Sequence, residues 1–397
     1  MGSKLICVHQ QYSADITPAM ASDPRISHLY FHIPFCAKLC PYCSFYVDTH
    51  FKNKSQGFLE ALLAEVEMRG ARNRLTPRTI YFGGGTPSSL SLSQLEYVLS
   101  GLRDRLDLSE LAEWTFEVNP ATVSIEKARL LRKLGVNRIS MGVQSWDDSI
   151  LKVLGRIHSA NQAEQTYHIL REAGFDNISL DLMFAVPTQT RAQWQSTLER
   201  TIALGPEHIS SYCLTYEEDT EFYHKLKTNQ FTQDEDWDAD LFEMTMDLLG
   251  DAGFIQYEIS NYALPGRESR HNCAYWSAHD YLGFGPGAFS TQGEKRWQNI
   301  ADTAAYTARM LAGESLATFE ETVSPTTRIG ERLAFSLRTI QGAQSEELQP
   351  WRSEIEEFVA LGLLQIQGTR TTLTRKGRLL ADSVAEIFVG VPGEKQI

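Results

Sequence analysis

Between residues 28 and 214, short apolar runs alternate with longer segments in which apolar residues recur at helical spacing. The short runs are rich in β-branched and aromatic residues and predict strands at 28–34, 79–82, 114–118, 138–143, 177–184 and 208–214. The longer segments predict helices at 56–70, 91–106, 124–134, 160–173 and 190–204. Strands that alternate with helices form a parallel sheet through right-handed crossovers. Because this region is too short for eight such units, we expect an α/β fold with an open, partial (β/α)6 barrel.

The alternation ends beyond residue 220. A helix is expected near 236–250 and a strand at 256–260, followed by a Gly-rich aromatic segment from His271 to Ser290. The remaining residues read as helical except for a hairpin at 363–374, which together indicate a helical, winged-helix-like module. This module lacks a dense Lys/Arg stripe, so a role in packing on the barrel or as a lid is favoured over DNA binding. The expected division is an N-terminal extension at 1–26, a barrel core at 27–300 and the C-terminal module at 301–397.

Length, composition and charge narrow the classes of function. With 397 residues, of which 42% are hydrophobic, the chain has enough apolar surface for a large core. A net charge of −13 argues against a general nucleic-acid or anionic-membrane binder, since either needs a basic face. No apolar run approaches the ~20 residues that span a bilayer, and the start of the chain lacks the apolar stretch of a signal peptide. We therefore expect a cytoplasmic protein with no stable membrane insertion and no nucleic-acid partner.

Three cysteines, Cys36, Cys40 and Cys43, follow the first predicted strand with the spacing C-x3-C-x2-C. One short loop with this spacing presents three thiolates to three irons of a [4Fe–4S] cluster. The fourth iron is then open to a ligand, as the open position of a catalytic zinc site is. In parallel barrels the chemistry gathers at the carboxyl ends of the strands, which is where this loop begins.

Two other interpretations of these cysteines are open. A structural zinc would need a fourth ligand, which His32 or His50 could supply, but zinc motifs usually consist of two separated ligand pairs. A disulfide would leave one of the three cysteines unpaired, and no secretory signal directs the chain to an oxidising compartment. The remaining cysteines, Cys7, Cys213 and Cys273, are scattered along the sequence.

Polar or glycine residues also end the next strands. The second strand ends in Gly83-Gly-Gly-Thr-Pro87, where the absence of Cβ atoms lets a ligand approach the backbone, or permits a tight turn. The following strands bring the acceptor Glu117, the donor and acceptor Gln144, and Asp181, a carboxylate within an apolar strand. Arg156 could bind a carboxylate bidentately. Together these side chains are predicted to converge on one pocket.

The cysteine loop, with Tyr42 just before its third cysteine, resembles the signature of the radical S-adenosylmethionine superfamily. The whole set, from Tyr30 to Glu217, resembles the oxygen-independent coproporphyrinogen III dehydrogenases and their relatives. The resemblance implies a (β/α)6 core, a [4Fe–4S] cluster held by the three cysteines, and S-adenosylmethionine as cofactor. It also implies the residues that line the S-adenosylmethionine site: Tyr30, Tyr42, Gly84, Gly85, Thr86, Glu117, Gln144, Arg156 and Asp181. Ala185 and Thr188 depart from the family pattern, which has glycines there.

Within this group, the chain is closer to the HemW family of heme chaperones. The dehydrogenase loop continues to a fourth cysteine, where this chain has Phe45, and it follows a longer N-terminal segment. The run from His271 to Trp276 fits the H-N-x-x-Y-W motif of the chaperones. This resemblance implies a cytoplasmic chaperone that binds heme and delivers it to membrane hemoproteins, with an electron donor as a further partner. The alternative is radical decarboxylation of coproporphyrinogen III propionates to vinyl groups in porphyrin biosynthesis.

The motif itself has two interpretations. His271 could be an axial ligand of heme, with Tyr275 and Trp276 offering flat apolar faces to the porphyrin. In that case the core includes a porphyrin-facing segment. Alternatively, His271 is a buried, hydrogen-bonded histidine, and the two aromatic residues pack the C-terminal module on the barrel.

Overall fold

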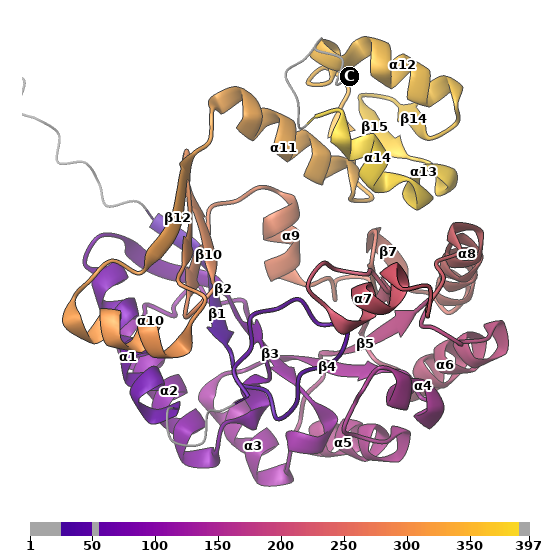
Figure 1. Ribbon diagram of the computed structural model, residues 1–397. Helices are drawn as coiled ribbons and strands as arrows, with labels where there is room; N and C mark the ends of the chain where they lie inside the picture. The colour runs from indigo at the N-terminus through magenta and orange to yellow at the C-terminus, as the bar shows by residue number, and fades with distance from the viewer. Residues whose placement is uncertain (1–24, 50–54, 389–397) are drawn as a thin grey trace, which may run out of the picture.

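The computed structural model describes residues 25–49 and 55–388, and its centre is a parallel sheet (Figure 1). The six predicted strands are present and pair in chain order, each parallel to the next. Their bounds are β1 Arg25–Ile33, β2 Arg74–Gly84, β3 Glu113–Val118, β4 Arg138–Gln144, β5 Ile178–Phe184 and β6 His208–Cys213. The outer helices are α1 Ser55–Gly70, α2 Leu92–Arg105, α3 Ile125–Leu134, α5 Ala160–Glu172 and α6 Arg191–Leu204. The predicted α/β barrel is confirmed, and a short α4, Asp148–Val153, adds to it.

Three further strands extend the sheet beyond the predicted six. At one edge β9, Leu282–Phe284, pairs parallel with β1. At the other edge β8, Asn261–Ala263, pairs antiparallel with β6, and β7, Ile255–Glu258, pairs with β8. The two edge strands, β7 and β9, do not pair with each other, so the barrel is open. β9 has only three residues, too few to show a periodic pattern in the sequence.

The two faces of the barrel sheet differ in chemistry. Phe31 of β1 stacks on Phe82 of β2 and on Phe284 of β9, with ring centroids 4.8 Å apart in both pairs, on the face that the helices cover. Such cross-strand aromatic pairs stabilise the register of neighbouring strands. Residues of opposite parity, such as His28 and Tyr30, lie on the inner face. Polar side chains therefore line the inside of the barrel, while the core lies between the strands and the helices.

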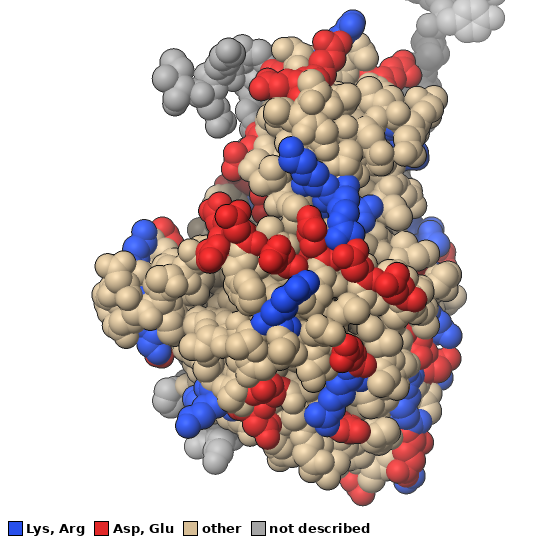
Figure 2. Space-filling view, turned by 90° about the vertical axis from the view of Figure 1, so that its right-hand side faces the viewer, with Lys and Arg blue, Asp and Glu red and all other residues tan. Residues whose placement is uncertain are grey.

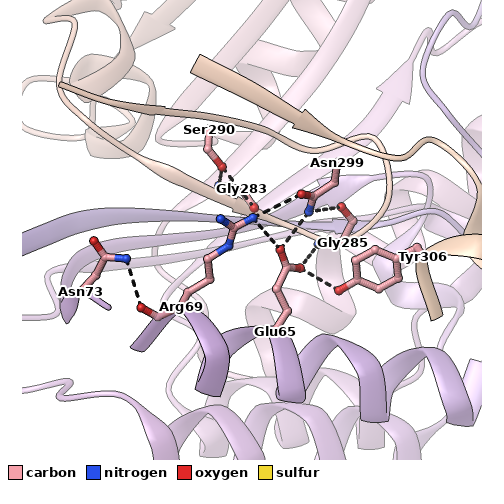
Figure 3. A network of polar contacts seen from close by, with 8 residues as sticks. All are labelled: Glu65, Arg69, Asn73, Gly283, Gly285, Ser290, Asn299 and Tyr306. Atoms are coloured by element: carbon pink, nitrogen blue, oxygen red, sulfur yellow. Dashed lines mark hydrogen bonds and ion pairs between the residues drawn. The ribbon is translucent and has the colours of Figure 1, made fainter. Parts of the chain in front are cut away.

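A buried carboxylate holds the segment after β9 against the barrel (Figure 3). Glu65 of α1 is fully buried and accepts hydrogen bonds from Gly285 N (2.9 Å), Asn299 Nδ2 (2.9 Å) and Tyr306 Oη (2.7 Å). Arg69, one helical turn later, places its guanidinium 3.3 Å from the same carboxylate. These contacts fix β9 beside β1, next to the loop that carries the three cysteines.

The C-terminal module forms its own hydrophobic core, which begins at Leu333. Tyr306 and Leu316 pack instead in the core of the barrel. We therefore propose a boundary near residue 324 rather than at residue 301. Between the barrel and that boundary lie β10 Phe289–Gln292, β11 Lys295–Asn299, α10 Thr303–Ala312 and β12 Ala317–Thr322. The module consists of α11 Pro325–Leu337, β13 Ala343–Gln344, α12 Arg352–Ala360, β14 Leu364–Gln367, β15 Arg370–Leu373, α13 Arg375–Leu379 and α14 Ala381–Glu386.

The module contacts the barrel through α9, Arg270–Trp276, and α8, Glu235–Asp251. The guanidinium of Arg338 lies 5.3 Å from the ring centre of Trp276, and Arg375 forms an ion pair with Asp247 of α8 at 2.5 Å. On the face shown in Figure 2, acidic side chains form a band across the middle, and basic ones lie in small groups among them. That face therefore presents no broad basic surface of the kind that nucleic acids require.

Two sequence expectations concern the ends of the chain and membranes. The first 24 residues of the expected extension lie outside the described residues, and β1 begins at Arg25. A short helix, α7 Glu221–Lys227, also precedes α8.

Within residues 25–49 and 55–388, none of the helices combines the length and the apolar character needed to cross a bilayer.

Candidate cluster and cofactor site

The three cysteines lie on the loop that follows β1, and all three are free thiols. Hydrogen bonds from Cys36 N to Asp48 O (3.2 Å) and from Asp48 N to Pro34 O (2.7 Å) close the base of this loop. A tight turn, with Cys43 N donating to Cys40 O at 3.1 Å, brings the second and third cysteines close along the chain. The loop is thus a closed, hydrogen-bonded unit that presents its three thiols at the carboxyl end of the barrel.

The glycine motif after β2 is bonded directly to this loop. Gly85 N donates to Ile33 O and Thr86 N donates to Phe35 O, both at 2.8 Å. The hydroxyl of Thr86 lies 3.4 Å from the sulfur of Cys36. The ends of the first two strands therefore form one rim around the cysteines.

Close packing explains why this motif consists of glycines. Gly84 has φ +100°, and a Cβ at that position would lie 2.5 Å from the imidazole of His32. A Cβ on Gly85 would lie 2.7 Å from the carbonyl carbon of Pro34. Such distances exclude any side chain without a shift of the backbone. The glycines thus let the second strand approach the cysteine loop closely.

Arg156 places a positive charge beside the cysteine loop. Its guanidinium donates to Gly142 O at 2.9 Å and lies 3.8 Å from the sulfur of Cys40. Its Nε is buried and has no partner among the described residues. Two residues beyond Gly142, at the end of β4, Gln144 adopts φ +66°, a strained conformation for a residue other than glycine.

Glu117 is held at the end of β3 by a side chain that the sequence analysis missed. Tyr81 of β2 donates a 2.7 Å hydrogen bond to its carboxylate. Burial raises the pKa of Glu117 to about 7, and the Tyr81 bond offsets part of this effect. The sequence did carry a signal for this contact: Tyr81 alternates with apolar neighbours in β2, which places its ring on the inner face of the barrel.

Asp181 lies level with Gly142 on the neighbouring strand and is satisfied by hydroxyl groups. Ser140 Oγ donates to its carboxylate at 2.8 Å, and Ser179 Oγ donates at 2.9 Å. Burial raises the pKa of Asp181, and these hydroxyl bonds act in the opposite direction. The cost of the polar group in an apolar strand is thereby reduced.

The two tyrosines of the predicted site lie in different surroundings. Tyr30 of β1 bonds through its hydroxyl to Nδ1 of His32 at 3.1 Å, on the inner face of the barrel. Tyr42 packs its ring against Phe222 of α7, with centroids 6.1 Å apart. Tyr42 thus packs the cysteine loop against α7, while Tyr30 faces the interior.

The donor chemistry fits an iron–sulfur cluster better than a single zinc ion. Across residues 25–49 and 55–388, no three Cys, His, Asp or Glu side chains converge on a point that could hold one ion. Each cysteine of a cluster binds its own iron, so the three sulfurs need not converge. His32 has both ring nitrogens engaged, by Tyr30 Oη and by Tyr46 O (2.9 Å), and His50 lies outside the described residues. The residues present therefore fit a cluster, which Cys36, Cys40 and Cys43 would hold.

The H-N-x-x-Y-W residues lie on α9, where the ring of His271 lies 5.2 Å from that of Tyr81 and Trp276 faces the C-terminal module. His271 is fully buried, and its nitrogens bond to Thr79 Oγ1 (2.8 Å) and Tyr275 Oη (2.9 Å). Trp276 packs edge-on against Phe335 of α11, with ring centroids 5.9 Å apart. In this structure neither ring nitrogen of His271 is available to a metal, because both form hydrogen bonds. Trp276 packs the C-terminal module on the barrel.

The two residues that replace glycines of the family pattern, Ala185 and Thr188, lie at strained backbone positions. Ala185 has φ +60° and Thr188 has φ +70°, the left-handed region that favours glycine. Glycines at these two positions would suit the left-handed backbone of the loop after β5, which this chain forms with larger residues.

Thr188→Gly is expected to raise the free energy of unfolding by about 0.5 to 1 kcal/mol. Relief of left-handed strain amounts to roughly 1–2 kcal/mol, and the added freedom of glycine in the unfolded chain cancels part of it. Thr188 is exposed, so no packing is lost. Urea denaturation measures the change, and a lower stability of the variant would contradict the strain.

Comparison with known proteins agrees with this geometry. Residues 30–201 match the model of the Radical SAM superfamily. The heme chaperone HemW of Lactococcus lactis is 35% identical over 370 residues, which cover 91% of this chain and 96% of the relative. HemW of Escherichia coli is 33% identical over 93% of this chain and 100% of its own. The solved structure of coproporphyrinogen III oxidase (HemN) from Escherichia coli covers 92% of this chain and 91% of its own, with a TM-score of 0.80 and 24% identity, which shows the shared fold.

Fold and cysteine loop together define a protein of the radical SAM class, and that class implies a [4Fe–4S] cluster and S-adenosylmethionine. Similarity to the relatives extends over nearly the full length of both chains. The chain belongs to the HemW family.

Proposed function

We propose that the protein is a cytoplasmic heme chaperone that binds heme, a [4Fe–4S] cluster and S-adenosylmethionine and delivers heme to membrane hemoproteins. The observation that carries this proposal is the full-length similarity to proteins named heme chaperones, at up to 35% identity. Phe45 supports it, because this side chain is 68% exposed at the position of the fourth cysteine in the dehydrogenase loop.

In this proposal the rim residues divide into two groups. Cys36, Cys40 and Cys43 hold the cluster. The residues that line the S-adenosylmethionine site are Tyr30, Tyr42, Gly84, Gly85, Thr86, Glu117, Gln144, Arg156 and Asp181. When bound, the cluster and S-adenosylmethionine supply the chemistry of reductive cleavage to a 5′-deoxyadenosyl radical, for which an electron donor is a required partner.

The second candidate function is the oxygen-independent oxidation of coproporphyrinogen III. The fold similarity to HemN favours it, since the core of that enzyme is shared. A shared fold does not carry the activity with it. The higher identity to the chaperones places this function second.

Transfer of heme tests the proposal directly. The cluster-loaded full chain, charged with one equivalent of heme, is mixed with membranes that contain an apo-hemoprotein. The proposal predicts that heme reaches the membrane protein faster from this donor than from serum albumin loaded to the same level. Equal rates from the two donors would contradict delivery by this protein.

The affinity for S-adenosylmethionine is expected to fall about tenfold between pH 8 and pH 6. Glu117 accepts strong, charge-assisted hydrogen bonds from ribose or amino groups as a carboxylate, and its pKa of about 7 means that the neutral form predominates below that pH. Calorimetric titration of the cluster-loaded protein at several pH values measures this. Glu117→Gln should bind more weakly at pH 8 and lose the step near pH 7, whereas a retained step would assign it to another group.

A further inference from the structure

The exposed histidine His279, just beyond α9, faces a buried histidine of β1. Its Nδ1 lies 3.3 Å from Nε2 of His28, and the two rings stack with centroids 5.4 Å apart. His28 is 9% exposed. Nε2 of His28 is thus placed to accept a hydrogen bond from Nδ1 of His279.

From His28 a chain of hydrogen bonds runs into the H-N-x-x-Y-W motif. Nδ1 of His28 lies 2.9 Å from Thr79 Oγ1, which lies 2.8 Å from Nδ1 of His271, and Nε2 of His271 lies 2.9 Å from Tyr275 Oη. The Thr79 hydroxyl has two lone pairs and can accept a hydrogen bond from each imidazole. When His28 donates from Nδ1 to Thr79, its Nε2 is the acceptor and His279 carries its proton on Nδ1. Its Nε2 then keeps a lone pair that points away from this chain.

The backbone also fixes His279. Ala278 adopts φ +53°, in the left-handed region, and caps α9 with a hydrogen bond from its N–H to Tyr275 O (2.9 Å). His279 N donates to Ala274 O at 3.0 Å, and Arg328 of α11 donates to the carbonyl of Ala278 at 3.4 Å. A residue other than glycine in this conformation is strained, and such strain often accompanies a functional position. The backbone that carries the His279 imidazole is therefore an ordered turn.

We propose that His279 is the axial ligand of the heme iron through Nε2, with His28 as the residue that positions its ring. This inference rests on the proposed function, in which heme is the cargo. A metal-binding histidine usually donates its second N–H to a fixed partner, which sets the tautomer and the ring orientation, and histidine is a common axial ligand of heme. The exposed guanidinium of Arg78, near enough to act on His28, suits the negative charge of a heme propionate.

Other side chains of the described residues fit this role less well. His168 and His224, the other exposed histidines there, lie on α5 and α7, and no hydrogen bond to a buried side chain orients either ring. Burial raises the pKa of the thiols of Cys213 and Cys273 to about 12, so both are protonated at pH 7 and poor ligands. Among the described residues, His279 alone combines exposure with a buried partner for the opposite nitrogen.

Titration of the cluster-loaded full chain with hemin, followed in the Soret region, tests this ligand. The matched variants are His279→Ala and His168→Ala, which each remove one exposed imidazole. We expect wild type and His168→Ala to share the spectrum of imidazole-ligated heme and the same Kd. His279→Ala should lose that spectrum and bind hemin at least tenfold more weakly, and added imidazole should restore the spectrum to His279→Gly.

The outcomes separate this inference from the function on which it rests. A His279→Ala variant that keeps the wild-type spectrum and Kd would overturn the ligand assignment while leaving heme binding intact. Wild-type protein that shows no saturable binding of hemin would overturn the proposed function itself. Because His279 is exposed, circular dichroism of the variants is expected to match wild type, so that a loss of binding reflects the ligand and not unfolding.

Discussion

Cys40→Ser is expected to reduce the iron content of the reconstituted protein from about four atoms per chain to near zero. The sulfur of Cys40 lies 3.8 Å from the guanidinium of Arg156, and a cluster iron is bound by the anionic thiolate form of its cysteine. Serine cannot supply that anion at neutral pH, and a cluster held by only two thiolates is labile. Iron analysis and the absorbance near 400 nm measure the loss.

Cys273→Ser provides the matched control for this change. Cys273 lies on α9, away from the loop, and its substitution also removes one thiol from a partly buried position. This variant should keep the full iron content. If Cys40→Ser kept full iron, or if Cys273→Ser lost it equally, the cysteine loop would not be the cluster site.

Gly84→Ala is expected to lower the free energy of unfolding by about 3 kcal/mol. Left-handed backbone costs a residue with a Cβ roughly 1–2 kcal/mol, and overpacking in a rigid region costs roughly 1–3 kcal/mol. Both terms apply, because Gly84 has φ +100° and the new Cβ would lie 2.5 Å from the buried ring of His32. Chemical denaturation followed by far-ultraviolet circular dichroism measures the change. The variant should also bind S-adenosylmethionine more weakly, because the contact with the His32 ring would push the second strand away from the cysteine loop and so distort the cofactor site.

Gly174→Ala separates the two causes. Gly174 follows α5 with φ +89°, and a Cβ there would meet nothing within 4 Å. It therefore tests the backbone term alone, and about 1 kcal/mol is expected. Equal losses in the two variants would show that the packing of Gly84 against His32 contributes nothing.

The sequence predicted the barrel well because its strands and helices carry strong local patterns. The six strands, their order and the outer helices follow from apolar periodicity, and the rim residues follow from their positions at strand ends. Cluster and cofactor ligation by those residues stays a prediction. β9 was not predicted, because three residues carry no period. It pairs directly with β1, and the buried network around Glu65 holds the residues that follow it.

Contacts between distant segments were the part that no local pattern shows. Tyr81 of β2 donates a hydrogen bond to Glu117 of the neighbouring strand β3. His28 contacts His279, which lies 251 residues away in the chain. The motif around His271 was visible as a pattern, whereas the engagement of both its ring nitrogens depends on Thr79 and Tyr275 in three dimensions. The available signal in the sequence was the alternation of polar and apolar residues along the strands, which places the polar side chains together on the inner face of the barrel.

Anaerobic incubation of the cluster-loaded protein with coproporphyrinogen III, S-adenosylmethionine and a reductant tests the central claim most directly. Porphyrin products are then oxidised and quantified by chromatography. The account predicts no conversion of propionates to vinyl groups, with the cluster intact and S-adenosylmethionine bound throughout. Repeated turnover to protoporphyrinogen would contradict the chaperone assignment and establish an oxidase that functions with Phe45 in place of the fourth cysteine.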